Sequence, residues 1–137
     1  MSSSAAPAEP ATPRALLIGH GEFAAGMRSA VQKITGRGDA LIALSGSEFS
    51  LAQMEAHLRQ QLAASAVSVI FTDLQAGSAT MAARKVQRDT PNVVLVVGAN
   101  LAVLLDFVLN TTATPGEAAT HAAERGRAAI IVHGGPA

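Results

Sequence analysis

Residues 15–27 read ALLIGHGEFAAGM, an apolar run that leads into Gly-His-Gly and then into a helical pattern. Polar and apolar residues do not alternate over Ala15–Gly19, which predicts a strand buried on both faces. After Glu22 the apolar residues recur at steps of three and four, which predicts an amphipathic helix. Its apolar face would consist of Phe23, Met27, Ala30, Val31 and Ile34. His20 therefore stands at the turn where a buried strand becomes a helix.

A histidine between two glycines is poorly suited to packing. Gly19 and Gly21 let the backbone turn tightly and leave room beside the imidazole. The first N–H groups of the following helix point at this turn and favour an anion there. A neutral imidazole is also nucleophilic near its ordinary pKa. Our hypothesis is that His20 carries a phosphoryl group, although from its local context alone it could equally be a turn or cap residue.

The rest of the chain repeats the alternation of apolar strands and amphipathic helices. Further strands are predicted at Ala40–Leu44, Val67–Thr72 and Asn92–Val97, with Ala129–Val132 as a candidate for a short last strand. This order predicts an α/β fold, with a doubly wound, mostly parallel sheet covered by helices on both faces. The flavodoxin-like strand order 2-1-3-4 fits the count.

In that order the first and third strands are neighbours, and a ligand crevice opens between their carboxyl ends. His20 leaves the first strand and Asp73 leaves the third. A carboxylate that accepts one ring N–H would fix the tautomer and steady the cation formed on phosphorylation. The N–H groups after Gly21, with the hydroxyl and N–H of Ser78, could bind the phosphoryl oxygens. Taken alone, Asp73 and Ser78 could each simply cap the following helix.

Composition narrows the range of functions. The 137 residues suffice for one domain, and 49% hydrophobic residues supply a core. A net charge of zero and 3% aromatic residues argue against nucleic-acid binding. Cysteine is absent, which excludes disulfides and thiolate chemistry. No apolar run reaches the length of a membrane span, and no signal peptide is recognisable, so we expect a cytoplasmic protein.

The chain ends and the remaining polar residues suggest no further site. Residues 1–14 are rich in Ser, Ala and Pro and are expected to form a disordered tail before one domain at 15–137. His57 is expected to be solvated, and His121 and His133 have no ligand-like spacing, so no metal is assigned. Asn100 suits a turn. We expect no cofactor.

Three blocks of sequence resemble the motifs of a known family. They are GHGEFAAGM at 19–27, TDLQAGS at 72–78 and VGANL at 97–101. In order and spacing they resemble the IIA component of the mannose/fructose/sorbose/N-acetylgalactosamine class of the bacterial sugar phosphotransferase system. The resemblance extends over roughly Leu16 to Gly126.

This resemblance implies that the histidine phosphocarrier protein HPr phosphorylates His20, and that a IIB component then receives the group. It places Asp73 beside the histidine and Ser78 at the border of the site. Because the donor is itself a phosphohistidine, no metal or nucleotide is required. The family is typically dimeric, with its C-terminal strand exchanged between subunits, which would give Ala129–Val132 a role. Contact with the membrane would be indirect, through IIC and IID partners.

The sequence departs from the family pattern at three positions. Ala76 replaces a glycine, Ala79 replaces a proline, and Ala102 stands where a proline is common. These changes bear on loop geometry and choice of partner, and they favour as an alternative a regulatory protein whose phosphorylated His20 controls a partner. A third hypothesis is a non-catalytic, flavodoxin-like module that binds a flavin or nucleotide. A variant of the first is the IIA-like subunit of dihydroxyacetone kinase.

Overall fold

A computed structural model describes residues 13–46 and 49–136. Most of the expected N-terminal tail lies outside these residues. The strands are β1 (Ala15–Gly19), β2 (Leu41–Ser45), β3 (Val69–Thr72) and β4 (Val94–Val96). The α-helices are α1 (Phe23–Thr35), α2 (Leu51–Ser65), α3 (Ser78–Asp89), α4 (Leu101–Leu109) and α5 (Pro115–Ala128), and a 3₁₀ turn, Gly38–Ala40, precedes β2.

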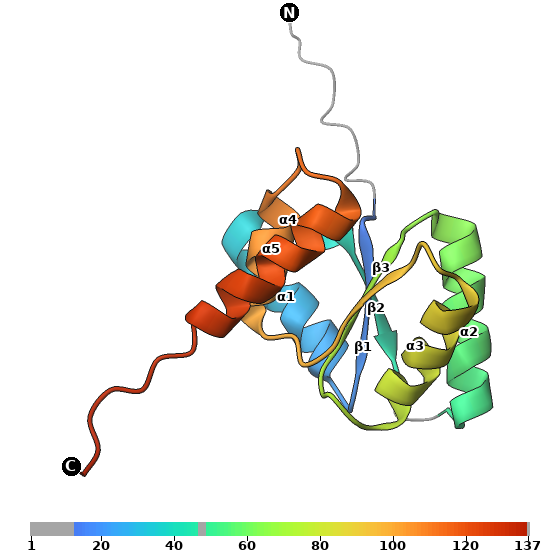
Figure 1. Cartoon of the computed structure of the whole chain (residues 1–137), viewed down its shortest axis with the longest axis horizontal. Helices are drawn as coiled ribbons and strands as arrows, with labels where there is room; N and C mark the ends of the chain where they lie inside the picture. The colour runs from blue at the N-terminus through green and yellow to red at the C-terminus, as the bar shows by residue number, and fades with distance from the viewer. Residues whose placement is uncertain (1–12, 47–48, 137) are drawn as a thin grey trace, which may run out of the picture.

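The strands form one parallel sheet in the order β2-β1-β3-β4. Helices α1, α4 and α5 cover one face and α2 and α3 cover the other, as Figure 1 shows. The prediction of a doubly wound sheet with order 2-1-3-4 is therefore confirmed. The pairing of β1 with β3 ends at Ile18 opposite Thr72, so the next residues of both strands emerge at the same edge.

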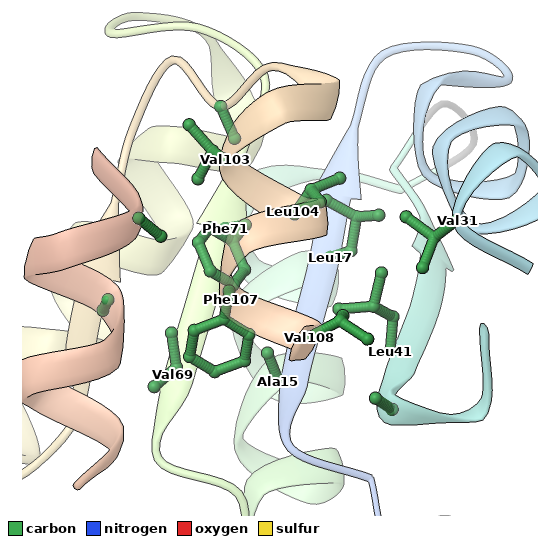
Figure 2. Packing of buried hydrophobic residues seen from close by; sticks show 14 of the residues in the cluster. Ala15, Leu17, Val31, Leu41, Val69, Phe71, Val103, Leu104, Phe107 and Val108 are labelled. Carbon is green, nitrogen blue, oxygen red and sulfur yellow. The ribbon is translucent and has the colours of Figure 1, made fainter. Parts of the chain in front are cut away.

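Alternate residues of the apolar strands face two separate cores. Leu17 and Phe71 point toward α4, and Figure 2 shows them packed with Leu104 and Phe107. The Phe71 and Phe107 rings meet edge to face with their centroids 5.0 Å apart, a favourable aromatic geometry. Ile70 belongs to the opposite core under α2 and α3. Burial on both faces explains why these strands lack a polar alternation.

The C-terminal segment differs from the prediction. Helix α5 continues to Ala128, and the expected strand Ala129–Val132 does not form in the single chain. Ile130 and Val132 are 72% and 87% exposed in an extension that leaves the body of the molecule (Figure 1). A strand needs a neighbouring backbone to complete its hydrogen bonds, and this segment pairs with no strand among the residues described.

Arg14, the last residue of the expected tail, is part of the folded body. Its guanidinium donates hydrogen bonds to the carbonyls of Phe107 (2.7 Å), Val108 (3.2 Å) and Asn110 (2.7 Å). The group also lies 4.5 Å from the centroid of the Phe107 ring. A cation here donates to carbonyls at the end of α4, of which that of Phe107 also accepts the Asn110 N–H, and it complements the helix dipole. Ordered structure therefore begins before Ala15.

We expect Arg14→Met to lower the free energy of unfolding by about 2 kcal/mol, because charge-assisted hydrogen bonds to the end of α4 are lost. Urea unfolding measures this change. The matched control is Arg84→Met on α3, since Arg84 is exposed and has no side-chain partner among the described residues. Equal stability of the two variants would contradict the role given to Arg14.

Candidate active site

His20 and Asp73 meet at the edge of the sheet where β1 and β3 end. The ring nitrogen Nδ1 of His20 lies 2.7 Å from Oδ2 of Asp73. The backbone N–H of His20 donates to the same oxygen at 2.8 Å. Because the two strands are adjacent and in register, residues 53 positions apart are held side by side. The juxtaposition expected from the parallel strand ends is present.

The electrostatics of the pair determine which ring nitrogen is available. Burial alone would raise the pKa of Asp73, but hydrogen bonds from the backbone and ring of His20 outweigh it and hold that pKa below its ordinary value. An ionised carboxylate only accepts hydrogen bonds, so Nδ1 of His20 carries the proton. In the neutral imidazole Nε2 then keeps its lone pair, on a side chain that is 59% exposed. The arrangement presents a nucleophilic nitrogen to solvent.

Two glycines make this close approach possible. A Cβ at Gly19 would lie 2.7 Å from Cγ of Asp73 and 2.6 Å from the Phe23 ring. A Cβ at Gly77 would lie 2.9 Å from Cε1 of His20, and Gly77 has a φ of +112°, which side chains rarely adopt. Both positions therefore require glycine, one beneath the carboxylate and one against the imidazole.

The site also lies at the N-termini of two helices. Neither α1 nor α3 has a side-chain hydrogen bond at its N-cap, which is Glu22 and Gly77 respectively. In contrast, α2, α4 and α5 are capped by the side chains of Ser50, Asn100 and Thr114. The Phe23 N–H donates to the His20 carbonyl at 3.0 Å, and the other first N–H groups of α1 and α3 can therefore bind an anion.

A hollow of about 250 Å³ opens beside the imidazole. It is lined by Gly21 and Ser78, the two residues predicted to bind phosphate, and by Phe49 and Met54 from the other side of the crevice. A larger groove of about 440 Å³ lies between β4 and α5, away from His20. We take the smaller hollow as the candidate active site, because it contains the exposed imidazole and borders the N-termini of α1 and α3.

The structure does not show the alternative roles of Asp73 and Ser78 as helix caps. Ser78 is the first residue of α3, not its N-cap: the N-cap is Gly77, which has a positive φ, so the helix starts one residue earlier than a Ser78 cap would place it. Asp73 does not cap α3 either, since its Oδ2 accepts from His20 and its Oδ1 is buried without a hydrogen-bond partner among the residues described. Asn100, expected in a turn, caps α4 and donates to the Gly126 carbonyl at 3.1 Å.

The departures from the family motif fit this geometry. Ala76 has no positive φ, so a glycine is not required there. Ala79 is a buried residue in the first turn of α3, where alanine suits the helix. The position that does require glycine, Gly77, retains it.

Sequence reasoning missed two polar clusters. Thr72 and Thr80 form a buried hydroxyl pair next to Asp73, with their oxygens 2.8 Å apart. His121, for which the sequence indicated no ligand-like spacing, lies with Nδ1 2.7 Å from Oδ2 of Asp106. Asp106 is the one charged residue in the apolar stretch LAVLLDFVL, a signal that could have indicated a specific partner.

His57, expected to be solvated, is half-buried, with its ring centroid 5.6 Å from that of Phe49. Within residues 13–46 and 49–136, no three histidine or carboxylate side chains are grouped to bind a metal ion. In the same residues no helix has the length and apolar character needed to span a membrane.

Solved structures with this fold include several components of the phosphotransferase system. The mannose/sorbose-specific IIA subunit of the phosphotransferase system from Enterococcus faecalis is 23% identical, with a TM-score of 0.76, and the match covers 92% of this chain and 98% of that one. The phosphotransferase system component EIIA from Streptococcus agalactiae is 17% identical with a TM-score of 0.76, covering 87% and 95%. The IIA protein associated with the fucose utilization operon of Streptococcus pneumoniae is 19% identical with a TM-score of 0.72, covering 88% and 93%.

Family membership follows from the sequence itself. The EIIA-man family, described as the phosphotransferase system fructose IIA component, matches residues 14–124. No curated protein matches the sequence. The chain belongs to the EIIA-man family, the mannose-type IIA components of the sugar phosphotransferase system.

We expect Gly77→Ala to displace the imidazole of His20. The added methyl group meets Cε1, and the positive φ costs about 1–3 kcal/mol. The NMR signal of the His20 Cε1–H proton should move. Gly98→Ala is the matched control, because Gly98 has a φ of +73° but nothing within 4 Å of an added Cβ. An unmoved His20 signal in the Gly77 variant would show that the contact does not position the ring.

Proposed function

We propose that this protein is a phosphohistidine carrier, which accepts a phosphoryl group from HPr on His20 and passes it to a IIB component for sugar uptake. The proposal is carried by the Nδ1–Asp73 contact of 2.7 Å, which leaves Nε2 free on an exposed ring. Membership of the EIIA-man family supports it, because the family belongs to a phosphotransferase system.

The chemical step uses only this pair and the donor. The lone pair on Nε2 of His20 attacks the phosphorus, and the bond between phosphorus and the donor imidazole breaks with its electrons returning to the donor. His20 becomes an imidazolium that keeps the Nδ1 proton, and the carboxylate of Asp73 stabilises that charge. Onward transfer to a IIB acceptor is the same step with His20 as the leaving group.

The surroundings of the ring can stabilise the transferred group. Phosphoryl transfer depends mainly on positioning and on charge stabilisation at the equatorial oxygens. The uncapped N–H groups of α1 and α3 and the exposed hydroxyl of Ser78 can supply donors, with Gly21 leaving space on the other side. This arrangement requires no metal or cofactor.

The route of the phosphoryl group requires two successive partners. The 59% exposure of the His20 side chain lets the donor and then the acceptor reach the same nitrogen. HPr and IIB would work in the cytoplasm, and contact with the membrane would come through IIC and IID.

We also propose a homodimer. Ile130 and Val132 are apolar and exposed at the end of the chain. The groove between β4 and α5 is lined by Val94–Gly98, next to the outer edge of the sheet. The terminal segment of a second copy could pair with this edge and bury both surfaces.

The assignment is tested by incubation with phosphorylated HPr, followed by the mass of the intact protein. The wild type should gain one phosphoryl group and His20→Ala none. His121→Ala is the matched control, because His121 forms the same Nδ1–carboxylate pair at 2.7 Å, with 57% exposure, yet lies within α5 and not at a helix start. This variant should be phosphorylated like the wild type. An equal gain on His20→Ala would contradict the proposal.

The same assay tests the role of Asp73. Asp73→Ala should slow transfer by about 10- to 100-fold, the usual effect of removing a carboxylate that orients a histidine. Asp106→Ala, which removes the carboxylate from His121, should leave the rate unchanged. Equal rates for the wild type and Asp73→Ala would remove Asp73 from the mechanism.

A further inference from the structure

Two threonines next to the site, Thr72 and Thr80, are fully buried although each carries a polar hydroxyl group. Thr72 is 0% and Thr80 is 1% exposed. The other buried residues of α3 are Ala79, Ala82, Ala83 and Val86, all apolar. A valine would fill the volume of Thr80 equally well, so the hydroxyl itself needs a purpose.

The two hydroxyls form hydrogen bonds that tie the loop after β3 to the first turn of α3. The Thr80 hydroxyl donates to the Leu74 carbonyl at 2.6 Å and lies 2.8 Å from the Thr72 hydroxyl. The Thr72 hydroxyl lies 3.4 Å from the same carbonyl, so both hydroxyl protons can be used within the cluster. On the backbone side, the Thr72 carbonyl accepts the Ala99 N–H at 2.9 Å. The residues before and after Asp73 are thereby fixed.

The carboxylate of Asp73 has few constraints of its own. Its Oδ2 accepts from the backbone and ring of His20, and its Oδ1 is buried with no hydrogen-bond partner among the described residues. In the part of the chain that the structure describes, no other side chain donates to this carboxylate, and besides His20 only the backbone N–H of Asp73 itself helps to lower its pKa. Its orientation must therefore come from the backbone of residues 72–74, which the threonine pair anchors to α3.

We propose that Thr80 is a positioning residue for phosphoryl transfer: through the Leu74 carbonyl and Thr72 it holds Asp73 where the carboxylate keeps the proton of His20 on Nδ1. This inference rests on the proposed function of His20 and adds a residue in α3 that does not touch the phosphoryl group. The hydroxyl of Thr80, not its volume, carries the effect.

The test compares Thr80→Val, which keeps the shape, with Thr80→Ser, which keeps the hydroxyl. Two quantities are measured: the rate of phosphorylation by phosphorylated HPr, and the tautomer of His20 from nitrogen-15 chemical shifts of the imidazole. Thr80→Val should slow transfer by about tenfold or more and lower the share of the Nδ1–H tautomer. Thr80→Ser should restore both.

His121 is an internal control in the same spectra, because its Nδ1 contacts Asp106 at 2.7 Å, remote in sequence from Thr80. Its tautomer should not change in any variant. If Thr80→Val does not fold, the double variant Thr72→Val/Thr80→Val takes its place. It removes both hydroxyls, so neither is left buried without the other as a hydrogen-bond partner. A variant that loses stability but keeps the wild-type rate and tautomer would make Thr80 merely structural and overturn the proposal.

The tautomer is read on unphosphorylated protein, so it separates this inference from the proposed function. If the wild type accepted no phosphoryl group, the proposed function would fail, while a His20 tautomer that depended on the Thr80 hydroxyl would still support the positioning. If transfer occurred but the His20 tautomer were the same in Thr80→Val, the positioning alone would be wrong.

Discussion

The hydrogen bond between Nδ1 of His20 and the carboxylate of Asp73 is the interaction on which the site depends. The backbone, rather than either side chain, sets the positions of these two residues. The parallel pairing of β1 with β3 brings the two strand ends together, and Gly19 and Gly77 remove the atoms that would keep the groups apart. The ionised carboxylate then confines the proton to Nδ1, so the fold sets the chemistry of Nε2 through backbone geometry.

A second histidine forms the same kind of pair with a carboxylate in a different setting. His121 and Asp106 repeat the 2.7 Å contact and nearly the same exposure of the ring. They connect α4 to α5, however, and His121 lies in the middle of a helix whose N-terminus is already capped by Thr114. At His20 the carboxylate is combined with the starts of two α-helices that have no side-chain cap, an arrangement that favours an anion.

The sheet and the meeting of His20 with Asp73 could be predicted because both follow from apolar runs and from the rule that parallel strands end at one edge. The start of α3 could not, because it depends on the positive φ of Gly77. Thr80 was missed because the partner of its hydroxyl, the Leu74 carbonyl, is defined only once the loop has folded. The segment Ala129–Val132 has the composition of a strand, but a strand forms only where another strand is beside it to pair with, and composition does not show whether one is there.

The most direct test of this account is to find which ring nitrogen bonds to phosphorus. Protein labelled with nitrogen-15 and phosphorylated by HPr would be examined by NMR for the coupling between phosphorus and the imidazole nitrogens of His20. The account predicts phosphorus on Nε2, with Nδ1 still protonated against Asp73. Phosphorus on Nδ1 would require the contact with Asp73 to break and would contradict the central claim.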